Sequence, residues 1–256
     1  MDLRDKVVVI TGASSGFGEL IARRCAAAGA RVVLAARSAG PLERLAESFG
    51  AERALAVPTD VADQAAVTRL AEATLDRFGR ADVLVNNAGF GVLDRIEEAD
   101  VADLQRMLDV NVVGAVRCTQ AFLPHMRAHR RGQIVMMASI AGVISTMNLG
   151  FYSATKHALV SLARTLMLEL AGTGVRCALI CPGIAATGFQ QHSGFGKYAR
   201  IARWADTTPE HVADATVRAI VRRTHGEVYV PWYGRLLAVA AFPLPGATRL
   251  VMRLVR

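Results

Sequence analysis

Short apolar segments rich in β-branched residues alternate with longer amphipathic segments along the whole chain. Several of the short segments are apolar throughout, rather than at every second position, which is typical of parallel strands buried on both faces. They predict strands at Lys6–Thr11, Arg31–Ala36, Arg53–Val57, Val83–Asn86, Gln133–Met137, Val175–Ile180 and Val228–Val230. The longer segments have apolar residues at helical spacing. They predict helices at Gly18–Ala28, Pro41–Phe49, Ala62–Arg77, Val101–His129, Tyr152–Ala171 and Pro209–Arg223.

This alternation continues over all 256 residues without a break in composition. It predicts one α/β domain, residues 1–256, built as a doubly wound parallel sheet of about seven strands with helices on both faces. Two segments depart from the pattern. Residues 188–206 are Gly-containing and aromatic, which is typical of a lid over a functional site, and residues 232–256 form a tail without acidic residues.

The end of this tail, residues 249–256, combines apolar and arginine positions in an amphipathic pattern. A basic amphipathic helix can lie on an anionic membrane surface as a peripheral contact. The same pattern suits a helix that packs on its own domain or on a partner subunit. We favour the packed helix, because a single short helix binds a membrane weakly.

Charge and cysteine content narrow the class of protein. The chain has 30 Lys and Arg against 22 Asp and Glu, but the arginines are scattered and no basic run indicates a nucleic-acid partner. No signal-peptide pattern is present and no apolar stretch reaches the ~18 residues of a membrane-spanning helix, so we expect a cytoplasmic protein. Free buried thiols are therefore expected at the four cysteines, Cys25, Cys118, Cys177 and Cys181.

Three glycines after the first predicted strand indicate a nucleotide site. At Gly12, Gly16 and Gly18 the backbone can approach a pyrophosphate, and the following helix offers N–H donors at its N-terminus. Arg37 follows the second strand, where an acidic residue usually accompanies a preference for NAD. A guanidinium can instead bind a 2′-phosphate, and the hydroxyls of Ser14 and Ser38 can add donors. The sequence therefore favours NADP(H) over NAD(H).

Further motifs follow the glycines in order. They are TGASSGFG at Thr11–Gly18, TDV at Thr59–Val61, NNAG at Asn86–Gly89, NVVG from Asn111, Ser139 followed by the Y-x-x-x-K pair Tyr152 and Lys156, and PGIAATG at Pro182–Gly188. With these motifs the chain resembles the short-chain dehydrogenase/reductase family over nearly its whole length. The resemblance implies one Rossmann-type NAD(P)-binding domain. Ala186 is a mild departure, because a bulkier residue is common at that position.

The resemblance also implies roles for individual residues. Asn111, Ser139, Tyr152 and Lys156 match the catalytic positions, with Asn111 holding a water that relays protons and Lys156 touching the nicotinamide ribose. Cofactor contacts are implied at Gly12, Ser14, Ser15, Gly16, Phe17, Gly18, Arg37, Asp60, Val61, Asn87, Ala88, Gly89, Tyr152, Lys156, Pro182, Gly183, Ile184 and Thr187.

The tyrosine and lysine fit the chemistry of carbonyl reduction. A nicotinamide supplies a hydride to carbon, and a general acid must supply a proton to oxygen. Tyr152 and Lys156 are four residues apart and share a helix face, so we expect the cation to lower the pKa of the phenol. Ser139 can donate a hydrogen bond to the same carbonyl oxygen. Lys156 is one of only three lysines in the chain, which makes its position here more informative.

Three histidines are interpreted as structural. His157 follows Lys156 directly, but successive helical residues are turned by about 100°, so its side chain points away from the Tyr152–Lys156 face. His125 and His129 lie near the end of a long predicted helix and away from the glycine motif.

The expected substrate pocket is mostly apolar. Substrate contacts are expected at Val143, Met147, Phe189, His192 and Trp204, and no metal site is expected. We predict an NADP(H)-dependent oxidoreductase that interconverts a carbonyl and an alcohol on a hydrophobic small molecule of steroid, retinoid or polyketide type. The cationic residues Lys197, Arg200 and Arg203 leave an anionic substrate open as an alternative.

A non-catalytic NADPH-binding sensor is the alternative function, because fold alone does not decide function. The complete set of Ser139, Tyr152 and Lys156 argues against it, since a sensor does not need a proton donor. The resemblance further implies a homodimer or homotetramer, associated through the helices near Val101–His129 and Tyr152–Ala171.

Overall fold

A seven-stranded parallel sheet forms the centre of the computed structural model, which describes residues 1–145, 147–185 and 206–236. Its strand order is β3-β2-β1-β4-β5-β6-β9. The strands are β1 (Val7–Thr11), β2 (Arg31–Ala36), β3 (Ala54–Pro58), β4 (Val83–Asn86), β5 (Gly132–Met137), β6 (Val175–Pro182) and β9 (Gly226–Val230). The predicted sheet is confirmed, with strand limits shifted by a few residues at most.

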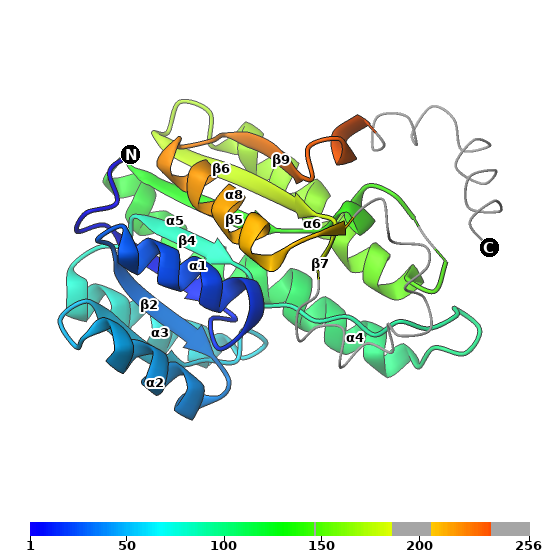
Figure 1. Ribbon diagram of the computed structural model, residues 1–256, viewed down its shortest axis with the longest axis horizontal. Helices are drawn as coiled ribbons and strands as arrows, with labels where there is room; N and C mark the ends of the chain where they lie inside the picture. Colours follow the sequence, from blue (N-terminus) through cyan, green and yellow to red (C-terminus); the bar gives the residue numbers. More distant parts are fainter. Residues whose placement is uncertain (146, 186–205, 237–256) are drawn as a thin grey trace.

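Helices cover both faces of the sheet. One face carries α1 (Gly16–Ala27), α2 (Ala39–Phe49) and α8 (Pro209–Val221), which lie in front of the strands in Figure 1. The opposite face carries α3 (Gln64–Phe78), α5 (Gly114–Ala128) and α6 (Gly150–Glu169). The prediction of helices on both faces is therefore confirmed.

The two cores explain why the strands are apolar at every position. In β1, Val7 and Val9 belong to the core under α5 and α6, whereas Val8 and Ile10 belong to the core under α1 and α8. Successive strand residues point to opposite faces, and here both faces are covered. Each such buried aliphatic side chain contributes roughly 1.5–3 kcal/mol relative to exposure. The four cysteines are buried in these cores as free thiols, as expected.

One predicted helix is interrupted. The structure replaces Val101–His129 by α4 (Val101–Leu108), a π-helical segment at Asp109–Val113 and α5. In the π segment, the N–H of Gly114 donates to the carbonyl of Asp109, five residues back. Such turns frequently mark functional sites, and this one contains Asn111.

The strands β7 (Ile184–Ala185) and β8 (Asp206–Thr207) form a separate parallel pair. Between them lie residues outside the described part of the chain, which include nearly all of the predicted lid. The expected contacts of Thr187, Phe189, His192 and Trp204, and the tail from residue 237 onward, also lie outside it. Within the described residues, no helix combines the length and apolar character needed to cross a membrane.

The strand order places the ends of β1 and β4 side by side. The chain builds the sheet outward from β1 in one direction and then, from β4 on, in the other. Crevices for ligands in such sheets open at this switch, on the edge where the strands end. We call this the carboxyl edge; it follows Thr11, Ala36, Pro58, Asn86, Met137, Pro182 and Val230.

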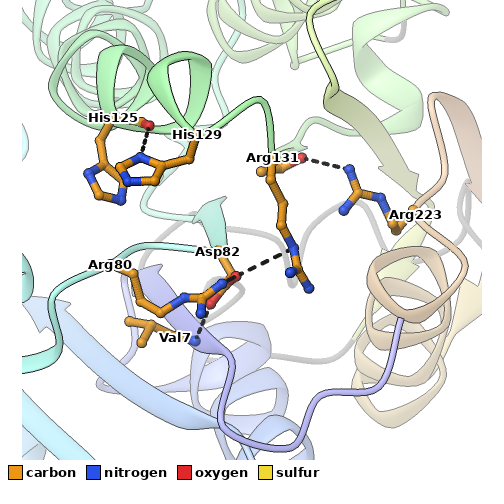
Figure 2. Close-up of polar contacts among 8 residues, drawn as sticks. Val7, Arg80, Asp82, His125, His129, Arg131 and Arg223 are labelled. Atoms are coloured by element: carbon orange, nitrogen blue, oxygen red, sulfur yellow. Dashed lines mark hydrogen bonds and ion pairs between the residues drawn. The ribbon is translucent and has the colours of Figure 1, made fainter.

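The opposite edge, which we call the amino edge, is where the same strands begin at Val7, Arg31, Ala54, Val83, Gly132, Val175 and Gly226. Its buried centre is the carboxylate of Asp82 (Figure 2). Asp82 accepts a hydrogen bond from the N–H of Val7 at 3.0 Å and pairs with Arg80, while Arg131 approaches to 4.0 Å. Every strand of the sheet has a basic residue within three positions of its start: Lys6, Arg31, Arg53, Arg80, Arg131, Arg176 and Arg223.

Candidate active site

The loop between β1 and α1 has a backbone that only glycine fits well. Gly12 and Gly16 have φ values of +66° and +57°, a region that side-chain-bearing residues rarely adopt. A Cβ on Gly18 would lie 2.2 Å from the carbonyl oxygen of Gly12. Ser15 precedes α1, and its side chain gives the helix no capping hydrogen bond. The loop thus presents first-turn N–H groups and the positive end of the helix dipole, as an anion site requires.

Asn87, which directly follows the neighbouring strand β4, fixes this loop. Its Nδ2 donates to the carbonyls of Thr11 at 2.9 Å and Gly12 at 3.2 Å. The Thr11 hydroxyl in turn accepts from the N–H groups of Asn87 and Ala88, both at 3.0 Å. The NNAG motif and the glycine motif therefore form one hydrogen-bonded unit at the switch point. The motif's first residue, Asn86, is instead buried and donates to Thr119.

Arg37 is exposed directly after β2, on the carboxyl edge. Within the described part of the chain its guanidinium has no hydrogen bond or ion pair, and the side chain of the next residue, Ser38, makes no cap to α2. The adjacent strand β3 leads to Asp60, whose carboxylate accepts from the N–H of Ala62 at 2.9 Å. Val61 is buried against Gly114. Arg37 thus lies at the end of the strand next to the glycine loop, with guanidinium N–H groups that no described residue accepts.

Ser139, Tyr152 and Lys156 come together after β5 and on the first turns of α6. The Ser139 hydroxyl donates to the Pro182 carbonyl at 3.5 Å and accepts from the N–H of Ala141 at 3.1 Å. It also lies close enough to Tyr152 for a side-chain hydrogen bond that lowers the pKa of the phenol. The Lys156 Nζ lies 5.7 Å from the centre of the Tyr152 ring and donates to the carbonyl of Met137 at 2.9 Å. The structure therefore brings together the three side chains that the sequence predicts to act in proton transfer.

Asn111 joins this group from the π segment. Its Oδ1 accepts from the N–H of Phe90 at 2.9 Å, and its Nδ2 donates to the Phe90 carbonyl at 2.8 Å and to Thr155 Oγ1 at 3.1 Å. A Cβ added to Gly89 would lie 3.0 Å from Asn111 Oδ1 and 3.5 Å from Lys156 Nζ. The missing side chain of Gly89 therefore leaves room for the Asn111 amide and the Lys156 ammonium to lie next to each other.

Burial shifts the two titrating groups of the site in opposite directions. It raises the pKa of Tyr152 to about 12, against a smaller lowering by the hydrogen bond from Ser139. Burial also lowers the pKa of Lys156 to about 8. The expected lowering of the Tyr152 pKa by Lys156 is thus not found, because desolvation of the phenolate dominates and the ammonium is bound to a backbone carbonyl.

The remaining site residues are placed as follows. Pro182 ends β6, the N–H of Gly183 donates to Val230 O at 2.7 Å, and Ile184 opens β7, all on the carboxyl edge. Of the predicted substrate contacts, Val143 and Met147 are described, and both are half-buried.

The three histidines are placed as the structural interpretation requires. His157 is exposed, and its Nδ1 lies 2.8 Å from the Ser153 carbonyl. His125 and His129 form a ring pair near Arg80 and Asp82 at the amino edge (Figure 2).

Sequence reasoning missed three partners of the site: the backbone of Phe90, the carbonyl of Met137 and the hydroxyl of Thr155. Backbone partners leave no signal in side-chain identity. Thr155 lies inside the Y-x-x-x-K motif, but its spacing alone does not indicate that it faces Asn111.

Comparison with known proteins gives consistent matches. The family model for short chain dehydrogenases matches residues 6–195. The meso-2,3-butanediol dehydrogenase of Serratia marcescens is 38% identical over 217 residues, which cover 83% of this chain and 86% of that protein.

Solved structures with the same fold include two with a bound nicotinamide cofactor. The 3-ketoacyl-(acyl-carrier-protein) reductase of Brucella melitensis, complexed with NADH, has a TM-score of 0.81 and 33% identity over 89% of this chain and 97% of its own. A short chain dehydrogenase/reductase of Burkholderia phymatum, in complex with NAD, has a TM-score of 0.81 and 32% identity over 98% of this chain and 94% of its own.

Proposed function

Because the chain belongs to the short chain dehydrogenase family and is an oxidoreductase, we propose that it interconverts a carbonyl and an alcohol on a small hydrophobic molecule, with NADP(H) as cofactor. The observation that carries the proposal is the hydrogen-bonded pair of Ser139 and Tyr152, with Lys156 Nζ 5.7 Å from the phenol ring. This group lies on the same edge of the sheet as the glycine loop, which supports a proton donor and a nucleotide site close to one another.

Tyr152 acts as the proton donor in the reductive direction. When bound, the nicotinamide cofactor supplies a hydride to the substrate carbon or accepts one from it. The phenol of Tyr152 delivers a proton to the carbonyl oxygen, and Ser139 donates a hydrogen bond to the same oxygen. The existing bond between the two hydroxyls supports this, because one oxygen can contact both. With a pKa of about 12, Tyr152 keeps its proton at neutral pH, as an acid must.

Lys156 and Asn111 complete the proton path. The Lys156 ammonium uses one donor on the Met137 carbonyl and has others for a ribose hydroxyl or a water. Its pKa of about 8 keeps most of it charged at pH 7 and lets it exchange a proton near neutrality. Asn111 supports the path from the π segment, next to Gly89 and close to the lysine.

The cofactor proposal rests on Arg37. The glycine loop and the uncapped start of α1 fit a pyrophosphate, and the unpaired Arg37 with Ser38 beside it fits a 2′-phosphate. A carboxylate at this position would favour NAD instead. The two solved relatives hold NADH and NAD, so the preference for NADP(H) is proposed from this chain's own residues.

A hydrophobic substrate is supported by Val143 and Met147 among the described residues. The contacts of Phe189, His192 and Trp204 stay predictions from the sequence. A non-catalytic NADPH sensor is not favoured, since it would not need the Ser139–Tyr152 pair. We also propose self-association through the π segment and α6, because Val113, Leu162 and Leu168 expose 37%, 39% and 79% of their surface.

The test is oxidation of NADPH with a panel of apolar and acidic ketones, for the parent protein and for Tyr152→Phe. We expect turnover of apolar ketones and a loss on the order of 10³-fold in the variant, because a positioned general acid contributes about 10²–10⁴-fold. Tyr229→Phe is the matched control, since its hydroxyl bonds Glu227 outside the site. An equally active Tyr152→Phe would reject the catalytic assignment, and turnover of acidic ketones alone would reject the hydrophobic substrate.

A further inference from the structure

Thr155 connects the π segment to the catalytic helix. Its hydroxyl accepts from Asn111 Nδ2 at 3.1 Å and donates to the Tyr152 carbonyl at 2.8 Å. We propose that Thr155 is a positioning residue for the reaction, which sets the orientation of the Asn111 amide and so the geometry beside Lys156. The proposal rests on the function proposed above.

Both hydrogens of the Asn111 Nδ2 are used, and Thr155 accepts the second of them. The two other bonds go to the N–H and carbonyl of Phe90, so the amide and the Phe90 backbone clamp each other. Nδ2 has two hydrogens, one for the Phe90 carbonyl and one for the Thr155 oxygen. Replacing the hydroxyl by a methyl group leaves the second hydrogen buried without a partner, which is costly because Asn111 is only 1% exposed.

The consequence reaches the reacting groups through Gly89 and Phe90. Asn111 Oδ1 and Lys156 Nζ both lie close to the position of an added Gly89 Cβ, at 3.0 and 3.5 Å. A rotated or displaced Asn111 amide therefore changes the surroundings of the lysine and releases the Phe90 N–H. Thr155 itself is fully buried, so it can contact neither cofactor nor substrate directly. Its loss should slow the reaction without weakening binding.

The variants are Thr155→Val, which is nearly isosteric, and Thr155→Ser, which keeps the hydroxyl. The matched controls are Thr74→Val and Thr216→Val. Both of these threonines are fully buried, and each hydroxyl donates only to its own helix, at Leu70 O (2.7 Å) and Val212 O (2.8 Å). The controls therefore lose a buried hydroxyl but no link between elements.

Two measurements test the proposal. We expect Thr155→Val to lower kcat about tenfold, the size of one lost buried hydrogen bond, with the KM values for cofactor and ketone unchanged. Thr155→Ser should restore most of the rate, and the two controls should leave kcat unchanged. Independently of activity, hydrogen–deuterium exchange of the Phe90 amide should become about tenfold faster in Thr155→Val alone, because that N–H is held by Asn111.

The outcomes separate this proposal from the proposed function. A parent protein without dehydrogenase activity would reject the proposed function, while the exchange measurement would still test the link from Thr155 to Phe90. An active parent whose Thr155→Val variant matches the Thr74→Val control in both kcat and Phe90 exchange would overturn the positioning role. A rise in KM without a fall in kcat would also overturn it.

Discussion

The central carboxylate of the amino edge and the guanidinium of Arg37 at the carboxyl edge differ in the partners that the fold gives them. At the amino edge, Asp82 is paired with Arg80 and the Val7 N–H, and Arg223 donates to the Gly174 carbonyl at 2.9 Å. At the carboxyl edge, the guanidinium of Arg37 and the first turn of α1 have no such side-chain partner among the described residues. Groups satisfied inside the fold stabilise it, whereas groups held in place without an internal partner are available to a ligand.

Helix direction accounts for the charge of the two edges. A helix that links two parallel strands must run back, so it begins at the carboxyl edge and ends at the amino edge. Helix N-termini favour anions and C-termini favour cations. The basic residues near the start of each strand therefore lie at the edge where helices end, where a positive charge is favourable. They are seven of the 30 Lys and Arg residues of the chain. A structural origin of this kind agrees with the absence of a basic run in the sequence.

After Tyr152→Phe, the largest effect on the reaction is expected from placing a charge of the wrong sign at the carboxyl edge. Arg37→Asp should lower the ratio of kcat/KM for NADPH to kcat/KM for NADH on the order of 100-fold. The substitution replaces a cation that can donate hydrogen bonds to the 2′-phosphate by a carboxylate that repels it. Arg222→Asp is the matched control: it makes the same charge change at an exposed arginine after α8, at the amino edge. An equal shift in both variants would mean a general field effect, and no shift in Arg37→Asp would contradict the phosphate site.

Removing the central carboxylate of the amino edge should affect stability instead. Asp82→Ala should lower the free energy of unfolding by about 2–4 kcal/mol, because it leaves the Val7 N–H buried and unpaired and breaks the pair with Arg80. Urea unfolding measures the change, and kcat below the unfolding transition should stay at the parent value.

Asp214→Ala provides the comparison for that variant. Asp214 pairs with Arg24 between α8 and α1, but both side chains are partly exposed, so its loss should cost less than about 1 kcal/mol. Equal losses in the two variants would show that Asp82 is no more important than a surface ion pair.

A gradual effect on the reaction is expected from pH. Lys156, with a lowered pKa of about 8, is charged below that pH, while Tyr152, at about 12, keeps its proton throughout. Reductive kcat/KM should therefore be level up to about pH 7 and fall by up to about tenfold per pH unit above pH 8, as the lysine loses its proton. The oxidative rate should rise over the same range.

Lys156→Arg tests whether the fall in reductive kcat/KM above pH 8, which we call the alkaline limb, is due to Lys156. An arginine stays charged throughout this range, so the fall near pH 8 should vanish even if the variant is slower. His157→Gln should keep the limb, since His157 is exposed and outside the site. A limb that persists in Lys156→Arg and disappears in His157→Gln would contradict the assignment.

Features that depend on local pattern could be predicted from the sequence. Each strand is a short apolar run, and the glycine loop depends on backbone freedom at Gly12 and Gly16, which residue identity reveals. Tyr152 and Lys156 share a helix face through spacing alone. These properties belong to a few consecutive residues, and the fold preserves them.

Features that depend on packing could not be predicted. Residues 109–113 lie inside one long amphipathic segment, and their π turn is apparent only where Asn111 meets Phe90 and Thr155. The pKa of Tyr152 rises rather than falls, because its burial follows from the assembled fold and outweighs a neighbour known from spacing. The seven basic residues of the amino edge are scattered in sequence and form a row only in the sheet.

The short β7–β8 pair has a consequence for how this protein can diversify. Ile184–Ala185 and Asp206–Thr207 hold the two ends of residues 186–205 together. The entropy of closing a loop grows slowly with length, by only about 0.6 kcal/mol for each doubling. A segment of different length or composition can thus be exchanged between these two fixed points while the proton donor and the glycine loop stay in place. The sequence predicts substrate contacts within this segment, so an exchange of the segment between the two strands is expected to change which substrates the protein accepts.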